Sequence, residues 1–401
     1  MFLKILQLVP EALPTFRPDV AVLFGKYLPR HQVVCDLVGT ADSAPFQEQN
    51  FASAQRPLYH SSRLRREWSF IKLSLRSLLS ARRGDCHIIQ VRDMVSIGLL
   101  AMCIARFKKI PFTYWVSYLM CEGRIENARH QLTRQPSLRQ RLVLVKGLLE
   151  AQLLYRLVLP GAKHIFVQSD AMRDYMIAKG IPAERLSAVP MGVDMELMEG
   201  APRSSRRPEG WQDVPLLAYL GTLDKSRNVE RLIEALQLLR VTVPRACLLL
   251  IGGSPYVQDE QDLLQYAERA GLSDAVRITG WLPSAQAWEL LLGADLALSY
   301  IPRGVRYDVS SPTKLLEYLA LAMPAVGNDS PDQVQVLEAS QAGWLTVSMP
   351  AAMASAMDEV LANPERARLR ASHGPAYIAS ARSYAIIAEQ VAQQYRHIAA
   401  A

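Results

Sequence analysis

The strongest chemical signal in the sequence is a short polar run that begins an amphipathic segment. Residues 310–317 read Ser-Ser-Pro-Thr-Lys-Leu-Leu-Glu. Ser311 before a proline predicts a helix start, because serine caps free backbone N–H groups and proline suits the first helical position. Those N–H groups and the positive end of the helix dipole favour a phosphate. Lys314 adds a positive charge in the first turn, so the run predicts an anion site.

The spacing within this run also places a carboxylate near the predicted anion. At about 100° per residue, Leu315 and Leu319 share the face that is expected to pack inward. The polar residues lie together on the other face: Ser310, Thr313, Lys314 and Glu317. Glu317 would then reach the ribose of a nucleotide whose phosphate lies at the helix start. Taken alone, the pattern slightly favours a capped surface helix with a solvated Lys and Glu.

The elements that must position these residues follow an alternating pattern. Short apolar runs alternate with helical patterns, which is typical of βα units and a mostly parallel sheet. Residues 198–213 are polar, rich in Pro and Gly and without periodicity, and predict a linker. The pattern restarts at residues 216–220. At 401 residues the chain is long for one core, so two Rossmann-like halves are the simplest assembly.

Several pieces of the second half resemble a known family. Residues 310–329 are similar to the donor-site stretch of the GT-B glycosyltransferases of family 4 (group 1), which are retaining enzymes. Further matching pieces occur in order at 165–169, 189–194, 219–223, 251–253, 279–282 and 294–295. The resemblance covers most of residues 164–343. It implies an α/β GT-B fold, with two Rossmann-like domains whose parallel sheets face across a cleft.

The resemblance also implies a role for each domain. Residues 1–197, with a C-terminal helix at about 383–401, would bind the acceptor, and residues 212–382 the donor. Glu317 matches the glutamate that binds ribose, and Arg227 falls on a position where the family places a diphosphate-binding lysine. The predicted donor-binding residues are Gly221, Thr222, Lys225, Arg227, Trp281, Leu282, Ser310, Ser311, Thr313, Lys314 and Glu317. Solvated cations in the 221–228 loop, and a core role for Trp281, remain open alternatives.

Two departures from the family pattern leave the catalytic residues unassigned. The first glutamate of the family is replaced by Val309, so Asp308, Ser310 or backbone N–H groups would contact the sugar. The family's histidine in the first domain is also missing, because residues 114–118 contain none. Arg92 and Asp93, at a strand end, are cleft candidates, and a structural salt bridge explains them equally well.

The charge of the chain is concentrated in its first half. Residues 1–197 carry 27 Lys and Arg against 16 Asp and Glu, a net charge of +11, whereas the remainder carries −4. Segments 63–83 and 129–146 are basic and amphipathic, which suits an anionic membrane surface and a lipid-linked or glycan acceptor. Solvated helix faces are the alternative. Nucleic acid is not expected, because no binding motif accompanies the charge.

Other classes of protein fit less well. The five cysteines are scattered and predict neither disulfides nor a zinc site, and no metal or cofactor is expected beyond the nucleotide-sugar co-substrate. Residues 10–15 lack the glycines of a dinucleotide-binding turn. The longest nearly apolar run, 95–105, is too short to span a membrane, so a cytoplasmic protein, peripheral on the inner face of the membrane, is expected.

The predicted function is therefore transfer of a sugar from a nucleoside diphosphate sugar to a hydroxyl group, with retention. The acceptor would be a lipid-linked glycan of bacterial-type surface polysaccharide synthesis. Two alternatives stay open: a GT-B-fold sugar-nucleotide epimerase, and a catalytically weakened partner protein at the membrane.

Overall fold

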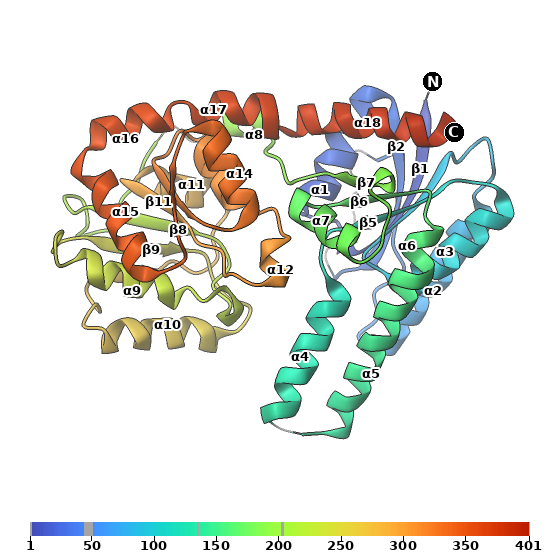
Figure 1. The fold of residues 1–401 in the computed structure, drawn as a ribbon, viewed down its shortest axis with the longest axis horizontal. Coiled ribbons are helices and arrows are strands. Elements are labelled where there is room, and N and C mark those ends of the chain that lie inside the picture. The colour runs from blue at the N-terminus through green and yellow to red at the C-terminus, as the bar shows by residue number, and fades with distance from the viewer. Residues whose placement is uncertain (1, 44–50, 135, 202–203, 401) are drawn as a thin grey trace. The chain divides into compact units, whose positions relative to one another are not determined.

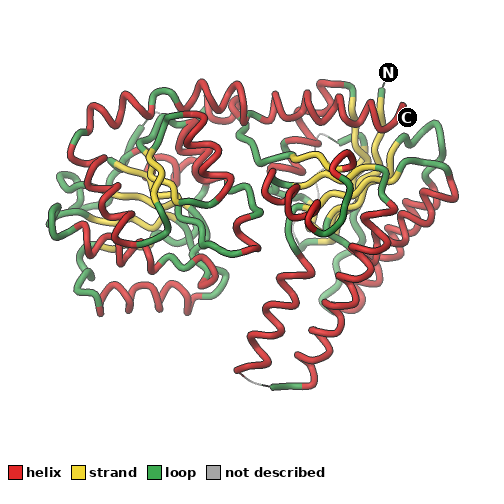
Figure 2. The backbone as a smooth tube through the Cα atoms, viewed as in Figure 1, coloured by secondary structure: helices red, strands yellow, loops and turns green. Residues whose placement is uncertain are grey.

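The chain forms two compact units, each built on its own parallel sheet. The computed structural model describes residues 2–43, 51–134, 136–201 and 204–400. Unit 1 comprises Met1–Met191 together with Tyr384–Ala401, and unit 2 comprises Gly192–Ser383. In both units the strands lie inside a covering of helices (Figures 1 and 2). This arrangement confirms the predicted class of two Rossmann-like α/β domains.

Unit 1 contains a seven-stranded parallel sheet in the order β3-β2-β1-β4-β5-β6-β7. The inner strands are almost entirely buried, as expected for apolar runs that are covered on both faces. The strands are β1 (Leu3–Leu13), β2 (Val33–Ala41), β3 (Ser53–Gln55), β4 (Ile88–Arg92), β5 (Phe112–Val116), β6 (His164–Val167) and β7 (Leu186–Ala188). The helices are α1 (Pro18–Ala21), α2 (Arg63–Ser80), α3 (Val95–Lys108), α4 (Met120–Arg134), α5 (Leu138–Leu153), α6 (Leu159–Gly161), α7 (Asp170–Ala178) and α18 (Tyr384–Ala400).

Unit 2 contains a six-stranded parallel sheet in the order β10-β9-β8-β11-β12-β13. Its strands are β8 (Leu216–Leu220), β9 (Cys247–Ile251), β10 (Val276–Ile278), β11 (Leu296–Ser299), β12 (Ala325–Asn328) and β13 (Trp344–Thr346). Its helices are α8 (Met195–Glu199), α9 (Glu230–Leu239), α10 (Val257–Arg269), α11 (Ser284–Leu292), α12 (Val305–Asp308), α13 (Thr313–Ala320), α14 (Pro331–Ser340), α15 (Pro350–Ala362), α16 (Pro364–Ala371) and α17 (Gly374–Tyr377).

Both sheets reverse their winding at one point. In unit 1 the chain moves outward from β1 through β2 to β3 and then returns to β4 on the other side of β1. In unit 2 it moves from β8 through β9 to β10 and returns to β11 on the other side of β8. Open α/β sheets bind ligands outside the carboxyl ends of the strands at such a switch point. The topology therefore singles out the ends of β1 and β4 in unit 1, and of β8 and β11 in unit 2.

The predicted linker is packed against unit 2 along part of its length. The backbone N–H of Arg206 donates to the carbonyl of Glu289 in α11 at 2.9 Å. The side chain of Arg207 forms an ion pair with Asp295 at 2.7 Å. Two residues of the segment that was predicted as a linker are therefore held on unit 2, by partners that local periodicity does not reveal.

The predicted basic segment 129–146 is divided between two helices. α4 and α5 pack on each other and form a helical hairpin that projects from the sheet of unit 1 (Figure 1). Along the described part of the chain, none of the helices combines the length and the apolar character needed to cross a bilayer.

Candidate functional site

The start of α13 differs from the predicted cap. The helix begins at Thr313, and the residue before it, Pro312, makes no side-chain capping bond. Ser311 is buried, and its hydroxyl donates to Asp332 at 2.9 Å. The residue directly before the helix is thus Pro312 rather than the predicted Ser311, whose hydroxyl donates its proton to a carboxylate of α14. Pro312 at the N-cap position offers no side-chain acceptor to the first N–H groups of α13, which suits binding of an anion there.

Lys314 lies against the end of β8. A β-carbon added at Gly221 would lie 3.2 Å from the Cδ atom of Lys314 and 3.4 Å from its Nζ atom. The Nζ atom is also 5.1 Å from the centroid of the Tyr219 ring. Burial and, to a smaller degree, the positive charge of Arg227 together lower the pKa of Lys314 to about 7, against the opposing effect of Glu317. Two cations thus converge beside the free end of α13.

Glu317 lies one turn further along α13 and is half-buried. Burial raises the pKa of its carboxyl to about 7, against the lowering effects of a hydrogen bond from Trp288 and of the charge on Lys314. Loss of solvation therefore dominates at both Lys314 and Glu317. The two shifted pKa values differ from those of a solvated Lys and Glu on an ordinary surface helix. Perturbed pKa values of this kind are common at functional sites.

The loop after β8 holds Arg227 near this pair of residues. The carboxylate of Asp224 accepts from the backbone N–H of Ser226 at 3.1 Å and from the Nε atom of Arg227 at 3.3 Å. The hydroxyl of Tyr307 donates to the carbonyl of Ser226 at 2.8 Å, and its ring lies 5.9 Å from the Arg227 guanidinium carbon. Lys225 is exposed, with its Nζ atom 4.0 Å from Asp262. Of the two loop cations, Arg227 is thus the one coupled to Lys314.

The ends of β8 and β9 approach each other through glycines. Gly252 has a φ of +134°, and a β-carbon there would collide with the backbone carbonyl of Gly221. A β-carbon at Gly253 would lie 3.0 Å from the ring of Trp281. Trp281 is 62% exposed and is therefore not a core residue. Its ring, with the half-buried Leu282 next to it, forms an open aromatic surface near the two glycines.

The residues predicted to contact the sugar make local contacts. The carboxylate of Asp308 accepts from the Nε atom of Arg303 at 2.7 Å. The hydroxyl of Ser310 donates to the carbonyl of Tyr307 at 2.6 Å. Val309, which stands where the family has a glutamate, is buried. Asp308 is thus held as an ion pair beside α13.

Arg92 and Asp93 form part of a buried ion cluster in unit 1. Arg92 is fully buried, and its guanidinium lies 2.5 Å from Asp19, 3.0 Å from Glu11 and 3.6 Å from Asp93. The prediction that Arg92 lines a ligand site is therefore wrong, and the salt-bridge alternative describes it. Asp93 accepts from the backbone N–H of Ser117 at 2.9 Å and from its hydroxyl, while burial raises its pKa.

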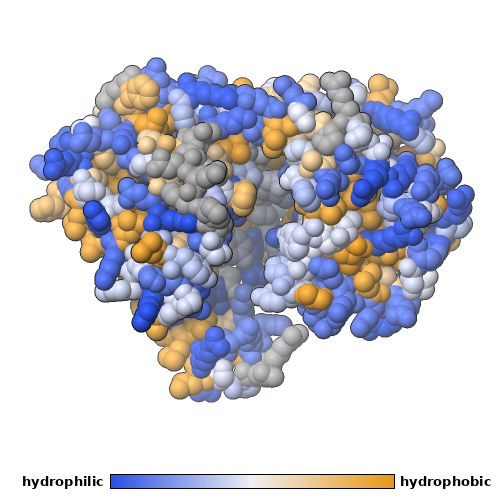
Figure 3. All heavy atoms as spheres, turned by 180° about the vertical axis from the view of Figure 1, so that it is seen from behind, coloured by the Kyte–Doolittle hydropathy of each residue, from blue (hydrophilic) through white to orange (hydrophobic). Residues whose placement is uncertain are grey.

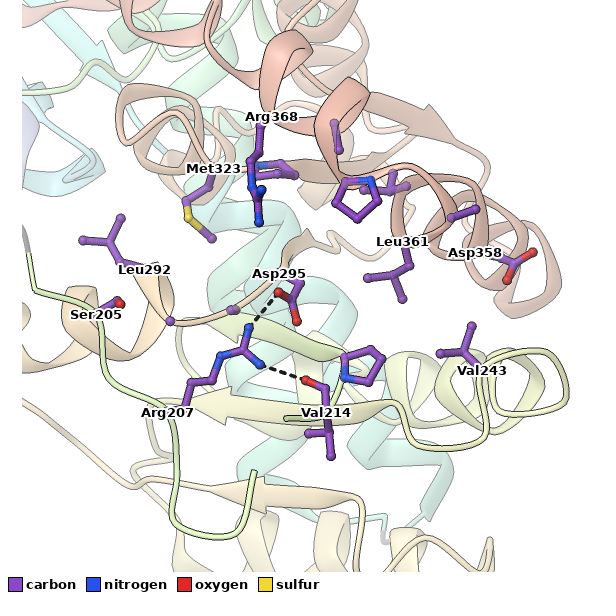
Figure 4. Close-up of a pocket in the computed structure, with 18 of the residues that line it drawn as sticks. Ser205, Arg207, Val214, Val243, Leu292, Asp295, Met323, Asp358, Leu361 and Arg368 are labelled. Carbon is purple, nitrogen blue, oxygen red and sulfur yellow. Dashed lines mark hydrogen bonds and ion pairs between the residues drawn. The ribbon is translucent and has the colours of Figure 1, made fainter. Parts of the chain in front are cut away.

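A cavity of about 920 Å³ in unit 2 lies at the edge of the sheet opposite the candidate site. It is lined by residues that precede β8, β11 and β12. Figure 4 shows Arg207 in this cavity, bonded to Asp295 at 2.7 Å and to the carbonyl of Val214 at 2.8 Å. No predicted donor residue lines it. Its position at the amino ends of the strands is not where open α/β sheets place their ligands.

The structure adds side chains to the site that the sequence prediction did not include. Tyr219 lies under Lys314, Tyr307 lies beside Arg227, and Trp288 bonds to Glu317. Tyr219 lies in β8, two residues before the predicted donor residue Gly221, and this closeness in sequence is the signal that could have found it. Trp288 and Tyr307 come from other elements and carried no local signal.

Two family models match the chain, one over each half. The model described as "Glycosyl transferases group 1" matches residues 203–374, and the model described as "Glycosyl transferase 4-like domain" matches residues 6–192. Together they include the whole site around α13 and most of unit 1.

Curated relatives match at low identity. A putative colanic acid biosynthesis glycosyltransferase of Escherichia coli (strain K12) is 27% identical over 179 residues, which are 44% of this chain and 42% of the relative. A GDP-mannose-dependent α-(1-6)-phosphatidylinositol monomannoside mannosyltransferase of Mycolicibacterium smegmatis is 28% identical over 192 residues, 46% of this chain and 50% of the relative. The chain thus spans about half the length of the curated relatives it matches.

Solved structures match along nearly the whole chain. Anabaena HepE in complex with UDP has a TM-score of 0.69 at 15% identity, covering 98% of this chain and 100% of that one. Sucrose-phosphate synthase from Thermosynechococcus elongatus has a TM-score of 0.68 at 15% identity, with 99% of each chain covered. At these identities the likeness shows the fold alone, and it confirms the predicted GT-B class.

Proposed function

Because the chain belongs to the group 1 glycosyltransferases of the family 4-like type, we propose that it transfers a sugar from a nucleoside diphosphate sugar to a hydroxyl group, with retention. The observation that carries this proposal is the convergence of Lys314 and Arg227 at the N-terminus of α13. Two cations that repel each other in a partly desolvated place, beside free N–H groups, are stabilised by a bound diphosphate. The site also lies at the switch point between β8 and β11.

Each part of the donor has a matching group in unit 2. The diphosphate would lie on the first-turn N–H groups of α13, with Lys314 and Arg227 as counter-charges. Glu317 would accept hydrogen bonds from the ribose hydroxyls, and the exposed ring of Trp281 would lie near the base. When the glycosidic bond breaks, negative charge grows on the departing diphosphate. Lys314, Arg227 and the helix end would stabilise that charge without a metal ion.

The proposed acceptor is a lipid-linked glycan presented at a membrane surface. Helices α2 and α5 of unit 1 each carry an exposed apolar stripe flanked by cations. The stripe of α2 comprises Leu64, Trp68, Leu75 and Leu79, and that of α5 comprises Leu138, Leu142, Val145 and Leu149. Figure 3 shows hydrophobic residues beside strongly hydrophilic ones at the projecting end of the α4–α5 hairpin. Such surfaces suit peripheral binding to an anionic membrane, here the cytoplasmic face.

Two relatives whose names state a pathway or a product support an acceptor of this kind. The Escherichia coli relative is named for colanic acid biosynthesis, and an α-monoglucosyldiacylglycerol synthase of Streptococcus pneumoniae is 23% identical over 270 residues. The proposal therefore places the protein in the synthesis of a bacterial-type surface polysaccharide or glycolipid.

A binding and transfer panel tests the proposal. Nucleoside diphosphate sugars are titrated by calorimetry, and transfer is measured with radiolabelled donors and a membrane extract as acceptor source. Arg227→Ala and Glu317→Ala should each weaken donor binding about tenfold or more, because each removes a charge-assisted hydrogen bond. Arg245→Ala is the matched control, since Arg245 is an exposed arginine before β9, at the other edge of the same sheet. Unchanged affinity in both site variants would refute the site assignment.

The same panel separates the other functions that fit the sequence. Donor turnover without any acceptor would indicate an epimerase. Donor binding without turnover in any extract would indicate a catalytically weakened partner protein.

A further inference from the structure

Unit 1 contains a cavity of about 730 Å³ at its own switch point. Pro10 of β1, Thr40 of β2 and Asp93 directly after β4 line one side of it. β1 and β4 are the neighbours between which the winding of the sheet reverses. The cavity therefore occupies the place in unit 1 that corresponds to the proposed donor site in unit 2, outside the carboxyl ends of the strands.

The walls of this cavity are mostly apolar. Phe70 of α2, Val95 and Ile97 of α3, and Met120 at the start of α4 contribute to the lining. Phe70, Val95 and Ile97 are buried, whereas Met120 is 40% exposed. A purely polar sugar would gain little from such walls, while a hydrocarbon chain would be desolvated by them.

The rim of the cavity is basic and only partly neutralised. Arg63 pairs with Glu67 at 2.9 Å, and Glu150 pairs with both Arg124 and Lys146. Arg66 also lines the cavity and is half-buried. Its guanidinium lies 5.6 Å from the centroid of the Tyr59 ring, and among the described residues it has no carboxylate partner. Arg66 is thus the rim cation that is available to an anion.

Two helices join this cavity to the exposed apolar stripes. The inner side of α2 supplies Arg66 and Phe70 to the cavity, whereas its outer side carries Leu64 and Trp68, which are 78% and 59% exposed. In the same way α5 supplies Lys146 to the cavity and exposes Leu142 at 61%. If the apolar stripes bind a membrane, a lipid of that membrane would lie next to the cavity, because α2 and α5 contribute to both the stripes and the cavity lining.

We infer that this cavity binds the head of a phosphate-bearing amphiphile, with the phosphate on Arg66 and the first part of the hydrocarbon chain against Phe70 and Met120. The inference rests on the proposed function, since it assigns the acceptor's chemical class and its place in unit 1. A polyprenyl carrier and a glycerophospholipid are the two sources of such a phosphate, because both present the same group to the same residues.

Soluble short-chain probes test the inference on the full chain. Farnesyl phosphate represents the polyprenyl source, dihexanoyl phosphatidylglycerol represents the phospholipid source, and farnesol is the uncharged control. Each is titrated by calorimetry below its micellar concentration. We expect at least one phosphate probe to bind, farnesol to bind at least about tenfold more weakly, and Arg66→Ala to weaken the phosphate probe by a similar factor. Which of the two phosphate probes binds more tightly identifies the source.

Matched variants keep the test specific. Arg76→Ala removes an exposed arginine of the same helix that does not line the cavity, and it should leave the affinity unchanged. Arg66→Lys should restore part of the affinity lost in Arg66→Ala. Equal losses in Arg66→Ala and Arg76→Ala would overturn the inference in favour of diffuse attraction, as would equal binding of farnesol.

Binding of a nucleoside diphosphate sugar is measured on the same samples. Nucleotide binding without binding of either phosphate probe would overturn the inference and leave the proposed function standing. Binding of a phosphate probe without binding of any nucleotide-sugar would support the cavity and contradict the proposed function.

Discussion

Lys314 and Glu317 are three residues apart on α13, and both are shifted away from their usual protonation behaviour. Burial lowers the pKa of Lys314 to about 7 and raises that of Glu317 to about 7. Arg227 adds to the shift of Lys314, so that part of the cost of charging this lysine is repulsion between two cations. A bound diphosphate would remove that repulsion and favour the protonated lysine.

Donor binding should therefore depend on pH through Lys314. The lysine is protonated below its pKa of about 7 and neutral above it, so its attraction for the diphosphate should fall as the pH rises through this range. This loss should outweigh the gain from ionisation of Glu317 over the same range, because Glu317 would contact only the uncharged ribose. We expect a several-fold weaker affinity at about pH 8 than at about pH 6, with at most about tenfold per pH unit. Lys314→Met should bind more weakly at the lower pH and lose most of the pH dependence. Calorimetric titrations at the two pH values check this, and a wild-type affinity that is constant or rises with pH would contradict it.

At the residue scale, the sequence indicated which chemistry a side chain could perform, but it did not indicate which distant residues that side chain contacts. Residue types alone led to the interpretation of the run at Lys314 as an anion site, which stays a prediction. The partner of Ser311 was not, because Asp332 lies 21 residues away and meets it only after α14 has packed. The sequence was equally compatible with a core role and a nucleotide-binding role for Trp281, and the exposure of its side chain rules out the core role. Arg92 is fixed by Asp19, 73 residues away in the chain, and local sequence carries no trace of that pairing.

Helices α2 and α5 are elements with two apolar sides. In α2 the inward side buries Phe70 and Leu78, while the outward side exposes Leu64 and Trp68. Exposed apolar residues that occur singly need no explanation, but a stripe at helical spacing beside cations indicates a partner surface. The ammonium of Lys72 lies 5.5 Å from the Trp68 ring centroid, so a cation accompanies the aromatic residue of the stripe.

Polar substitutions in the α5 stripe should weaken membrane binding without destabilising the fold. Leu142 and Val145 are about 60% exposed, at 61% and 60%, so the double variant Leu142→Gln/Val145→Gln removes little buried apolar area. Co-sedimentation with vesicles that contain phosphatidylglycerol should drop several-fold, while the midpoint of thermal unfolding stays within a few degrees. Leu238→Gln, at an exposed leucine of α9 in unit 2, is the control. Undiminished sedimentation of the double variant would contradict the proposed membrane surface.

At the element scale the strands were the most predictable feature. The continuous apolar run 216–220, where the pattern was predicted to restart, forms the buried parallel strand β8 with the same bounds. The hairpin of α4 and α5 was not predicted, because the segment 129–146 was interpreted by its charge alone, although Pro136 and Ser137 mark the break between the two helices. The packed linker at Arg206 and Arg207 was missed since its partners, Glu289 and Asp295, belong to later elements.

The two units of the molecule are connected twice by the chain, because the last helix belongs to unit 1. α18 contributes Tyr395 to the core of the first sheet, where its ring lies 4.9 Å from Phe166 and 6.3 Å from Phe24. The Tyr395 hydroxyl donates to the side chain of Gln90 at 2.6 Å, and Thr113 donates to the same oxygen at 3.1 Å. A buried polar bond within an aromatic cluster fixes the helix in one position, since any slip would leave the buried Gln90 with one partner fewer.

Replacing this tyrosine should destabilise unit 1 selectively. Tyr395→Ala leaves a cavity and removes a hydrogen bond, which together cost about 3–5 kcal/mol of unfolding free energy. Denaturant unfolding followed by circular dichroism should show an earlier transition for the part of the signal that comes from unit 1. The later transition should keep its shift on adding a nucleoside diphosphate, because the proposed nucleotide site lies in unit 2. A variant that unfolds as the wild type does would refute the anchoring role of α18.

The most direct test of the proposed function is calorimetric titration of the full chain with nucleoside diphosphate sugars. Wild-type protein and Arg245→Ala should bind at least one of them with equal affinity, and Arg227→Ala and Glu317→Ala should each bind it about tenfold or more weakly. No binding of any nucleotide-sugar by the wild type, or equal binding by all four proteins, would contradict the assignment of the site at α13.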